Sequence, residues 1–570
     1  MRRSTTMEEI TPELIASIAT RLFREPPPMA AAPLPGFEPP AMSTFPGLPA
    51  PPTSLPVASN PAHFPLTAPG YKPGTGGLPV PSVPSEVPRG FGLPHYGVSP
   101  PFSMPARPSP STVPANTSAT DGVRAFVERV QSGESLNRSG FCTQDRVLQR
   151  FRNVASKSEL KLSYASRPFD VNAVRADFPI LQQQVHGKPL AWLDNAATTQ
   201  KPQVVIDAIA NYYSRDNSNI HRAAHTLAAR STDAYEGARQ KVQNFLGAAS
   251  PKEIVFARGT TEAINLVART FGKKFLLPGD EIVLSTLEHH ANIVPWQMVA
   301  RETGAVIRII PVNDRGEILL TEYENLLGRR TKLVALTHAS NSLGTVLPIA
   351  DMTRIAKRYG ARVLIDGAQT VAHIGVNVET LDCDFFVFSG HKIFAPTGIG
   401  ALFAKHELLD LLPPWQGGGN MIKDVTFEET TYSDPPARFE AGTPSIGDAV
   451  GLGAALDYVT RLGLPNIAKY EHELLEYGTE KLSRIDGLRL VGTAREKVGV
   501  LSFVLPGKRT EEVGRLLDLE GIAVRAGHHC SQPSLRRFGL ESTVRPSLSI
   551  YNTHEELDRL AEAVRRIQRL

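Results

Sequence analysis

The sequence predicts an α/β protein with a mostly parallel sheet covered by helices, preceded by a long disordered extension. Two observations predict the sheet. From about Phe169 onward, short apolar runs alternate with amphipathic stretches, and the apolar runs lack the polar alternation of half-exposed strands. A third observation predicts the extension, because 28 of the 47 prolines lie at or before Pro114. Proline removes backbone donors and opposes regular structure.

The proline-rich segment, residues 26–119, has the composition of a disordered chain. Only five charged side chains lie between positions 26 and 114, and no helical or strand period is visible. Seven aromatic residues, from Phe37 to Phe102, are spaced among the prolines. They are either incidental residues of a spacer or short anchors that dock on a partner in extended form.

Helical segments are predicted on both sides of this region. In residues 1–25, Thr11 can cap a helix whose first residue is Pro12, and apolar side chains then recur on one face. An isolated helix this short is marginal in water, so its apolar face needs a partner. Residues 120–168 are predicted to form a helical linker. Cys142 lies in that linker and has no assigned role.

Composition excludes several classes of protein. The formal net charge of the 570 residues is only +4, which argues against nucleic acid or an anionic membrane as the main partner. Three cysteines cannot form a disulfide framework and fit a reducing compartment. The N-terminus lacks the continuous apolar segment of a signal peptide, and no run of about 18 apolar residues predicts a membrane span. We therefore expect a cytoplasmic protein.

The predicted strands follow one another along the chain from residue 253 onward. Their sequences are EIVFA, EIVLS, VIRIIPV, LVALTHAS, RVLIDGA and FFVFSG. Helix-like segments such as TEAINLVARTF and IADMTRIAKRYG separate them. Because ligands of such sheets bind at the carboxyl ends of the strands, functional residues are expected directly after the strands.

Polar motifs do follow these strands. LIDGAQ places Asp366 at a strand end and Gln369 one turn later. FFVFSGHK places Ser389, His391 and Lys392 at the end of another strand. Each motif has an ordinary interpretation when taken alone, because a strand-end aspartate is often a helix cap and a loop lysine is usually solvated.

Two further motifs follow other strands. ARGTTEAINL places Thr260 and Thr261 at the start of a helix, where backbone N–H groups and hydroxyls suit a phosphate. TLEHHANIVPW places His289 and His290 in a loop. A Gly-Thr-Thr turn by itself is weak evidence for a phosphate.

Together the four motifs fit pyridoxal phosphate. That cofactor needs a lysine for a Schiff base, a carboxylate beside the ring nitrogen, a phosphate cradle and a flat group to stack on the ring. Lys392, Asp366, the turn at Thr260 and Thr261, and an imidazole supply these parts.

The chain from Phe169 to Leu570 resembles a group II (SUF-type) cysteine desulfurase of the class-V aminotransferase family. Matching motifs occur in order, among them LDNAATTQKP, IHRAAHTL, RGTTEAINLVA, EHHANIVPWQ, DGAQ, SGHKIFAPTGIG, FEAGTP and VRAGHHCSQP. The resemblance implies a fold-type I, pyridoxal-phosphate-dependent homodimer that converts L-cysteine to L-alanine and keeps the sulfur as an enzyme persulfide. It implies a large cofactor-binding domain over residues 169–430, whose first residues join the small domain, and a small α/β C-terminal domain over residues 431–570.

The resemblance also implies roles for individual residues. Lys392 forms the Schiff base, Asp366 pairs with the ring nitrogen, and His289 stacks on the ring and acts in acid–base steps. The other residues implied to hold the cofactor are Gln369, Thr260, Thr261, Asn341, Ser389 and His391, together with Thr443 of the partner subunit. The residues implied to bind substrate are Arg545, Arg525, Asn341 and, again from the partner, His221 and Arg222.

Cys530 holds the position of the persulfide cysteine in this resemblance. Cys383 lies in an apolar strand pattern and is expected to pack in the core. A metal site at His528, His529 and Cys530 is disfavoured, because three consecutive side chains diverge and no ligand pair at the usual spacing accompanies them. Serine and glutamine follow Cys530, where the familiar Suf enzyme has alanine and methionine. This departure leaves activity level and acceptor preference open.

Alternative functions remain at this stage. Selenocysteine lyase uses the same fold and chemistry, whereas an ordinary aminotransferase does not need Cys530. A different class of function is an interaction protein, in which the first 165 residues form the interaction module and the enzyme is its passenger. A proline-rich, weakly charged extension on such an enzyme resembles the desulfurase cargo of family 2 encapsulin shells, which would place the protein inside a nanocompartment. The competing interpretation of the extension is a spacer or a tether to another sulfur-pathway protein. The sequence does not determine the sulfur acceptor, so the sulfur could serve Fe–S assembly or sulfur storage.

Overall fold

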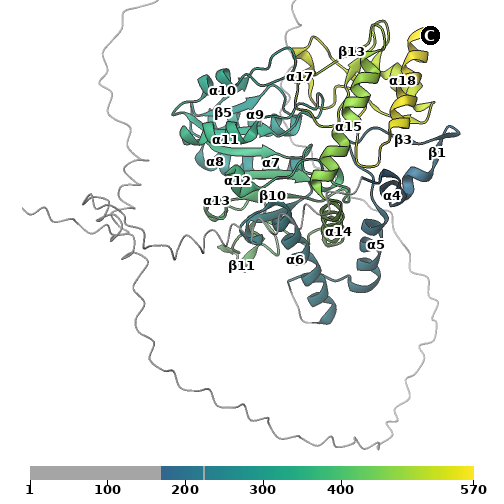
Figure 1. Cartoon of the computed structure of the whole chain (residues 1–570). Coiled ribbons are helices and arrows are strands. Elements are labelled where there is room, and N and C mark those ends of the chain that lie inside the picture. The colour runs from purple at the N-terminus through teal and green to yellow at the C-terminus, as the bar shows by residue number, and fades with distance from the viewer. Residues whose placement is uncertain (1–168, 222–224) are drawn as a thin grey trace, which may run out of the picture. The chain divides into compact units, whose positions relative to one another are not determined.

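The computed structural model describes residues 169–221 and 225–570. Figure 1 shows these residues as ribbons. The expectations for residues 1–25, 26–119 and 120–168, which include Cys142, lie outside the described residues, as does the expectation for Arg222.

A seven-stranded sheet forms the centre of the described part of the chain (Figure 1). Its spatial order is β4-β10-β9-β8-β7-β5-β6, and neighbouring strands are parallel from β9 to β6. Strand β10 runs antiparallel to both of its neighbours. The strands are β4 (Ile254–Ala257), β5 (Glu281–Ser285), β6 (Val306–Ile310), β7 (Thr331–Thr337), β8 (Arg362–Asp366), β9 (Phe385–Ser389) and β10 (Gly400–Ala404). The prediction of a mostly parallel sheet is confirmed.

Each central strand is buried on both faces, which explains its uninterrupted apolar sequence. In β8, Val363 and Ile365 belong to one hydrophobic core and Leu364 belongs to a second core. Successive side chains of a strand point to opposite faces, so the two cores lie on opposite sides of the sheet.

Helices cover both faces of this sheet. One core contains residues of α7 (Thr260–Val267), α9 (Val294–Thr303) and α13 (His406–Leu411), and α8 (Lys273–Phe275) packs beside it. The other core contains residues of α5 (Gln203–Asn211), α6 (Thr226–Leu246), α10 (Leu320–Leu326), α11 (Ile349–Arg358), α12 (Val378–Leu381) and α14 (Ile446–Leu462). Helix α14 packs on α5 and α6.

A smaller sheet forms a second lobe with its own core. Its order is β13-β14-β17-β16, and β15 pairs in parallel with β3. The strands are β3 (Ala191–Trp192), β13 (Arg489–Leu490), β14 (Phe503–Val504), β15 (Ile522–Ala523), β16 (Arg525–Gly527) and β17 (Thr543–Arg545). The helices are α15 (Leu464–Ser483), α16 (Thr510–Asp518), α17 (Gln532–Arg537) and α18 (His554–Arg569). Ala191 and Leu193 join this core although they precede the large sheet in sequence.

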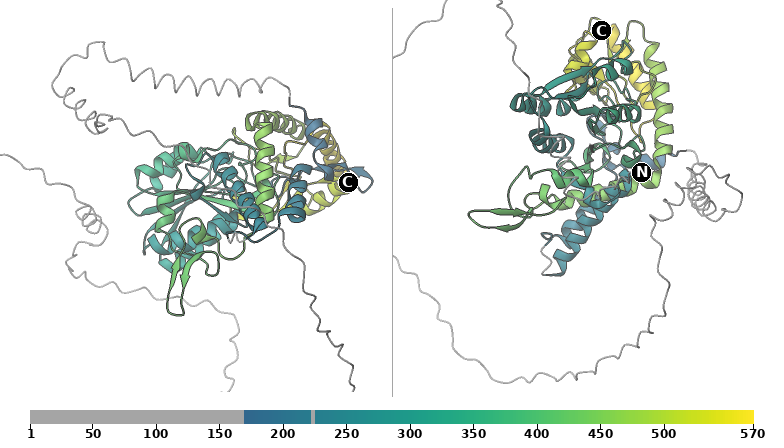
Figure 2. Two further views of the ribbon diagram at one scale, coloured as in Figure 1. Left: turned by 90° about the horizontal axis from the view of Figure 1, so that it is seen from below. Right: turned by 90° about the vertical axis from the view of Figure 1, so that its left-hand side faces the viewer.

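The remaining elements are short. They are α4 (Val171–Ala176), β1 (Gln184–Val185) and β2 (Lys188–Pro189), together with β11 (Ile422–Val425) and β12 (Thr430–Tyr432). The last two strands pair as an antiparallel hairpin, which projects from the body in both views of Figure 2. No helix among the described residues is both long and apolar enough to span a membrane.

Candidate active site

The predicted site residues lie where the parallel strands end. Asp366 is the last residue of β8 and Ser389 is the last residue of β9, while Thr260 begins the helix that follows β4. His289 follows β5, and Asn341 follows β7. Strands β9, β8, β7 and β5 are neighbours, and β4 lies beyond β10 in the same sheet. Their carboxyl ends therefore bring the five segments together.

A cavity of about 180 Å³ lies at this edge and is lined by residues of both lobes. The large sheet and its loops contribute Thr260, Thr261, His289, Asn341, Asp366, Gln369, Ser389, His391 and Lys392. The smaller lobe contributes Arg525, His529, Cys530 and Arg545. The fold therefore gathers residues that are up to 349 positions apart, from Ala196 to Arg545, around one space.

The start of α7 forms a polar cradle against the end of β9. The Thr260 backbone N–H donates to Ser389 Oγ at 2.9 Å, and Ser389 Oγ lies 3.0 Å from Thr260 Oγ1. A side chain at Gly259, whose φ is +153°, would place its Cβ 3.0 Å from Ser389 Oγ. Thus glycine is required for the close approach of helix and strand, and the cradle has the N–H and hydroxyl donors that a phosphate needs.

Lys392 and Asp366 form an electrostatic couple in the cavity. Burial lowers the pKa of Lys392 to about 8, although the charge of Asp366 acts in the opposite direction. Burial also raises the pKa of Asp366, against the hydrogen bond from the Ala368 N–H at 2.9 Å and the charge of Lys392. A lysine with a lowered pKa is partly neutral near pH 8, as an amine that attacks a carbonyl must be.

His289 is held as a neutral imidazole. Burial, followed by the charge of Lys392, lowers its pKa to about 3. Its Nδ1 accepts a hydrogen bond from the Ala291 N–H at 3.0 Å. The neutral ring therefore carries its proton on Nε2, and it can stack on an aromatic ligand or donate that proton.

Arg545 is the buried cation of the site. It is 1% exposed, and burial lowers its pKa to about 10. Its Nη2 bonds Asp194 Oδ1 at 3.1 Å, and its Nη1 donates to the Asn341 carbonyl at 2.9 Å. Its Nε has no hydrogen-bond partner among residues 169–221 and 225–570. An unpaired buried N–H is costly, so this group suits an incoming carboxylate.

Asp194 was missed by the sequence reasoning, although it lies in the quoted motif LDNAATTQKP. Its second oxygen, Oδ2, lies 3.3 Å from Nε of Arg525, so one carboxylate holds both arginines of the site. In the sequence, Asp194 follows two apolar residues and precedes an asparagine, and this local pattern does not indicate a functional role. Only the pairing of β3 with the smaller lobe brings it to the arginines.

Glu288 was also missed. It is fully buried next to His289 and accepts hydrogen bonds from Asn292 Nδ2 at 2.7 Å, from the Thr337 N–H at 3.0 Å and from Ser285 Oγ. Burial raises the pKa of Glu288 to about 7. It joins the end of β5 to the end of β7 and so supports the loop that carries His289. The position of Glu288 directly before His289 in the motif EHH was the sequence feature that could have indicated it.

The Cys530 loop crosses from the smaller lobe to the loops of the large sheet. Cys530 is half-buried and lines the cavity. His529 and Cys530 both have left-handed backbones, with φ of 55° and 54°. Cys383, in contrast, is fully buried in the core, where burial raises the pKa of its thiol to about 12. Among the described residues, no cluster of His, Cys, Asp or Glu could hold a metal ion.

Two predicted residues lie away from this chain's cavity. His221 bonds Glu236 Oε1 at 3.0 Å through its Nε2 and faces Asn420 Oδ1 at 3.4 Å. Thr443 is exposed in the loop before α14. Both residues were expected to serve the site of a partner subunit, and neither lines the cavity of its own chain.

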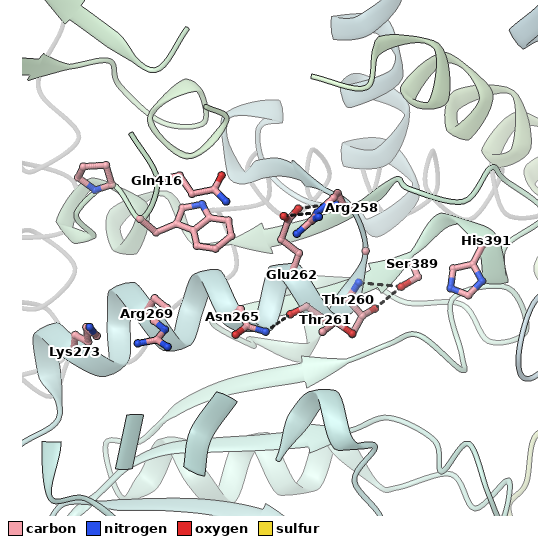
Figure 3. A pocket seen from close by; sticks show the side chains of 13 residues that line it. Arg258, Thr260, Thr261, Glu262, Asn265, Arg269, Lys273, Ser389, His391 and Gln416 are labelled. Atoms are coloured by element: carbon pink, nitrogen blue, oxygen red, sulfur yellow. Dashed lines mark hydrogen bonds and ion pairs between the residues drawn. The ribbon is translucent and has the colours of Figure 1, made fainter. Parts of the chain in front are cut away.

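A second, wider cavity of about 880 Å³ adjoins the cradle (Figure 3). It shares Thr260, Thr261, Ser389 and His391 with the first cavity. Figure 3 shows Asn265, Arg269 and Lys273 following one another along the helix away from the cradle. The phosphate end of the candidate site therefore opens onto a polar groove in the single chain.

Comparison with known proteins assigns the family. A family model described as aminotransferase class-V matches residues 191–560, which is more than half of the chain. The chain belongs to the class-V aminotransferase family. This member of the family is 65% identical over 400 residues to a cysteine desulfurase of Synechococcus elongatus, with 70% of this chain and 64% of that protein covered. It thus spans less than two thirds of that relative's length.

Other relatives of this class-V family member are covered almost completely. A cysteine desulfurase of Escherichia coli is 50% identical over 403 residues, which are 70% of this chain and 99% of that protein. A solved apo structure of a cysteine desulfurase from Thermococcus onnurineus matches with a TM-score of 0.66 and 37% identity, covering 69% of this chain and 98% of that chain. An Escherichia coli cysteine desulfurase in an S-sulfonic acid form matches with a TM-score of 0.65 and 39% identity, over 70% of this chain and 98% of that chain.

Proposed function

We propose that this protein is a pyridoxal-phosphate-dependent cysteine desulfurase that converts L-cysteine to L-alanine and retains the sulfur on Cys530. The single observation that carries the proposal is that Cys530 and Lys392 line one cavity, together with the buried cation Arg545. An aminotransferase has no use for a thiol at this place. The relatives named as cysteine desulfurases support the same reaction.

The residues present fit the cofactor. Its phosphate would lie in the cradle of Thr260, Thr261, Ser389 and His391, its ring nitrogen beside Asp366, and its ring against His289. When bound through Lys392, pyridoxal phosphate supplies an electron sink for the substrate α-carbon. Gln369 lines the cavity and is held by a 2.8 Å bond from its Nε2 to the Ala196 carbonyl.

The chain's own groups bind the substrate and move its protons. Arg545 receives the substrate carboxylate, because its guanidinium is buried and its Nε is unpaired within the described chain. Arg525, tethered by Asp194, assists at the more exposed side. Lys392, whose pKa is about 8, takes and returns protons at the substrate carbon, and His289 donates from Nε2.

The sulfur transfer joins the sulfur atom of Cys530 to that of the substrate. The Cys530 thiolate attacks the substrate sulfur, so a new S–S bond forms while the substrate C–S bond breaks. The electron pair of the broken bond stays on carbon, which takes up a proton and ends as the methyl group of alanine. Cys530 ends as a persulfide. Lys392, Arg525 and Arg545 place positive charge around the cavity that receives the thiolate.

Replacement of Cys530 tests the proposal. Cys530→Ala should bind pyridoxal phosphate with the wild-type absorption spectrum, yet form alanine and sulfide from cysteine, with a reductant present, at least about a thousandfold more slowly. Cys383→Ala is the matched control, because that thiol lies in the core. Full turnover by Cys530→Ala would exclude the proposed nucleophile. Rates on selenocysteine and cysteine, measured side by side, would distinguish a selenocysteine lyase.

The SUF-type branch is the finer assignment that we propose. It rests on the short Gly-His-His-Cys loop around Cys530, which differs from the longer small-residue loop of the other desulfurase group. We also propose a homodimer in which Thr443, His221 and Arg222 of each chain serve the partner's site. The groove that opens the phosphate cradle of a single chain supports this arrangement, since a partner would close it.

For the proline-rich N-terminal region we propose a role as cargo signal for a family 2 encapsulin shell. Its composition supports this role. Co-expression of the full chain and of a chain lacking residues 1–120 with a candidate shell protein tests it, and only the full chain should co-purify with assembled shells. Equal packaging of both chains would contradict the cargo role. Desulfurase activity should survive the deletion, because every candidate site residue lies within residues 169–570.

A further inference from the structure

The loop that carries Cys530 is held in a conformation that its own backbone disfavours. His529 and Cys530 follow one another with φ of 55° and 54°. Residues with a Cβ rarely adopt this left-handed region, and two in succession persist only where surrounding contacts impose it. The contacts that impose it therefore determine where the sulfur of Cys530 lies.

One side chain bonds the loop on both sides of the cysteine. Nδ2 of Asn341 donates to the His529 carbonyl at 2.6 Å. Oδ1 of the same amide accepts a hydrogen bond from Ser531 Oγ at 2.9 Å. Asn341 thus bridges the residue before Cys530 and the residue after it.

The amide has one orientation that satisfies both partners. A carbonyl can only accept, so the nitrogen of Asn341 must face His529. The oxygen then faces Ser531, whose hydroxyl donates to it at 2.9 Å, closer than the other acceptor within reach, the Glu288 carbonyl at 3.4 Å. Ser531 is fully buried and Asn341 is 5% exposed, so water cannot easily replace either bond. Among the described residues, no other donor to Asn341 Oδ1 is within hydrogen-bond distance.

Other bonds attach the same loop to the sheet but do not surround the cysteine in this way. The His290 N–H donates to the Cys530 carbonyl at 2.8 Å, and Ser534 Oγ donates to the Thr286 carbonyl at 2.8 Å. Ser534 is also fully buried, yet it lies in α17 and does not bond Asn341. Removing the Ser534 hydroxyl therefore breaks a comparable buried hydrogen bond and leaves both hydrogen bonds of Asn341 intact.

We propose that Ser531 is a positioning residue that, through Asn341, fixes the Cys530 thiol for attack on the substrate sulfur. This inference rests on the proposed desulfurase function. It gives a role to the serine that stands where the familiar Suf enzyme has alanine. Asn341 lines the cavity as well, so the bridge also joins the position of the nucleophile to the wall of the cofactor pocket.

The test compares Ser531→Ala with Ser534→Ala in the cofactor-loaded full chain. The first readout is the rate at which Cys530 is alkylated by iodoacetamide, followed by mass spectrometry of the Cys530 peptide. Ser531→Ala should change this rate by about three- to tenfold, the effect of one buried hydrogen bond. Ser534→Ala should leave it within twofold of wild type, and both variants should keep the wild-type cofactor spectrum.

The second readout is alanine formation. Ser531→Ala should lower kcat by about three- to tenfold with KM nearly unchanged, because the substrate contacts remain. In an Asn341→Ala background, Ser531→Ala should have no further effect on alkylation, since the bridge is already broken. Alkylation or kcat equal to wild type in Ser531→Ala, or the same change in Ser534→Ala, would overturn the proposal. If wild type formed no alanine while alkylation behaved as expected, the desulfurase function would fail and the bridge would stand.

Discussion

Single residues in the site owe their properties to burial. Lys392 and Asp366 have ordinary intrinsic chemistry, but burial lowers the pKa of the lysine to about 8 and raises that of the aspartate. Each charge opposes the shift of the other. The lowered pKa suits a Schiff-base lysine, whereas the raised pKa of Asp366 would be offset by a bound pyridinium, whose positive charge favours the carboxylate. The sequence motifs indicated both residues without indicating either shift.

Replacing Lys392 tests the covalent attachment of the cofactor. Lys392→Ala should still bind pyridoxal phosphate through the cradle, but the visible absorption band of the lysine-bound form should disappear. Absorption spectra of the purified variant after addition of the cofactor measure this. Lys405→Ala, a surface lysine paired with Asp382, is a suitable control. A visible band equal to that of wild type in Lys392→Ala would contradict the assignment.

Elements of the two lobes are joined by buried polar contacts. Nδ1 of His373, in the segment after β8, lies 2.7 Å from Glu471 Oε2 in α15. Burial alone lowers the pKa of His373, but the charge and hydrogen bond of Glu471 outweigh it, and the net pKa is raised. The ion pair therefore links the loop beyond Asp366 to a helix of the smaller lobe.

The raised pKa predicts how this contact responds to pH. A histidine whose folded pKa exceeds its unfolded value stabilises the fold fully below the unfolded pKa, about 6.5, and the contribution is lost as pH rises through the folded pKa. Each unit of the shift corresponds to about 1.4 kcal/mol. We therefore expect the melting temperature of wild type to exceed that of the double variant His373→Gln/Glu471→Gln at about pH 6. This difference should shrink as the pH is raised. A constant difference between pH 6 and 9 would show that the pair does not titrate.

At the scale of the whole molecule, the phosphate cradle of a single chain is open on one side. The cradle opens onto the groove of Figure 3, and Thr443 lies exposed away from its own cavity. If each chain serves its partner, mixed dimers can be made with one intact site. This arrangement follows from an isologous interface, in which both chains exchange the same residues.

A mixing experiment tests the exchange. Lys392→Ala chains and Thr443→Ala chains, refolded together, should yield activity at limiting cofactor that neither variant has alone. In a mixed dimer, the site with a normal Lys392 receives a normal Thr443 from the other chain. Random pairing should leave about a quarter of all sites intact. No recovery on mixing, with mixed dimers verified by native mass spectrometry, would place Thr443 outside the partner's site.

The sequence by itself determined the class of fold and most of the cavity. Burial of strands on both faces demands continuous apolar runs, and ligand residues at strand ends must follow those runs, so Asp366, Ser389 and Lys392 could be found without coordinates. Only the tertiary structure decided which side chains support Arg545, His289 and Cys530. Asp194, Glu288 and Ser531 act through hydrogen bonds to segments far away in the chain, and no local pattern encodes such a partner.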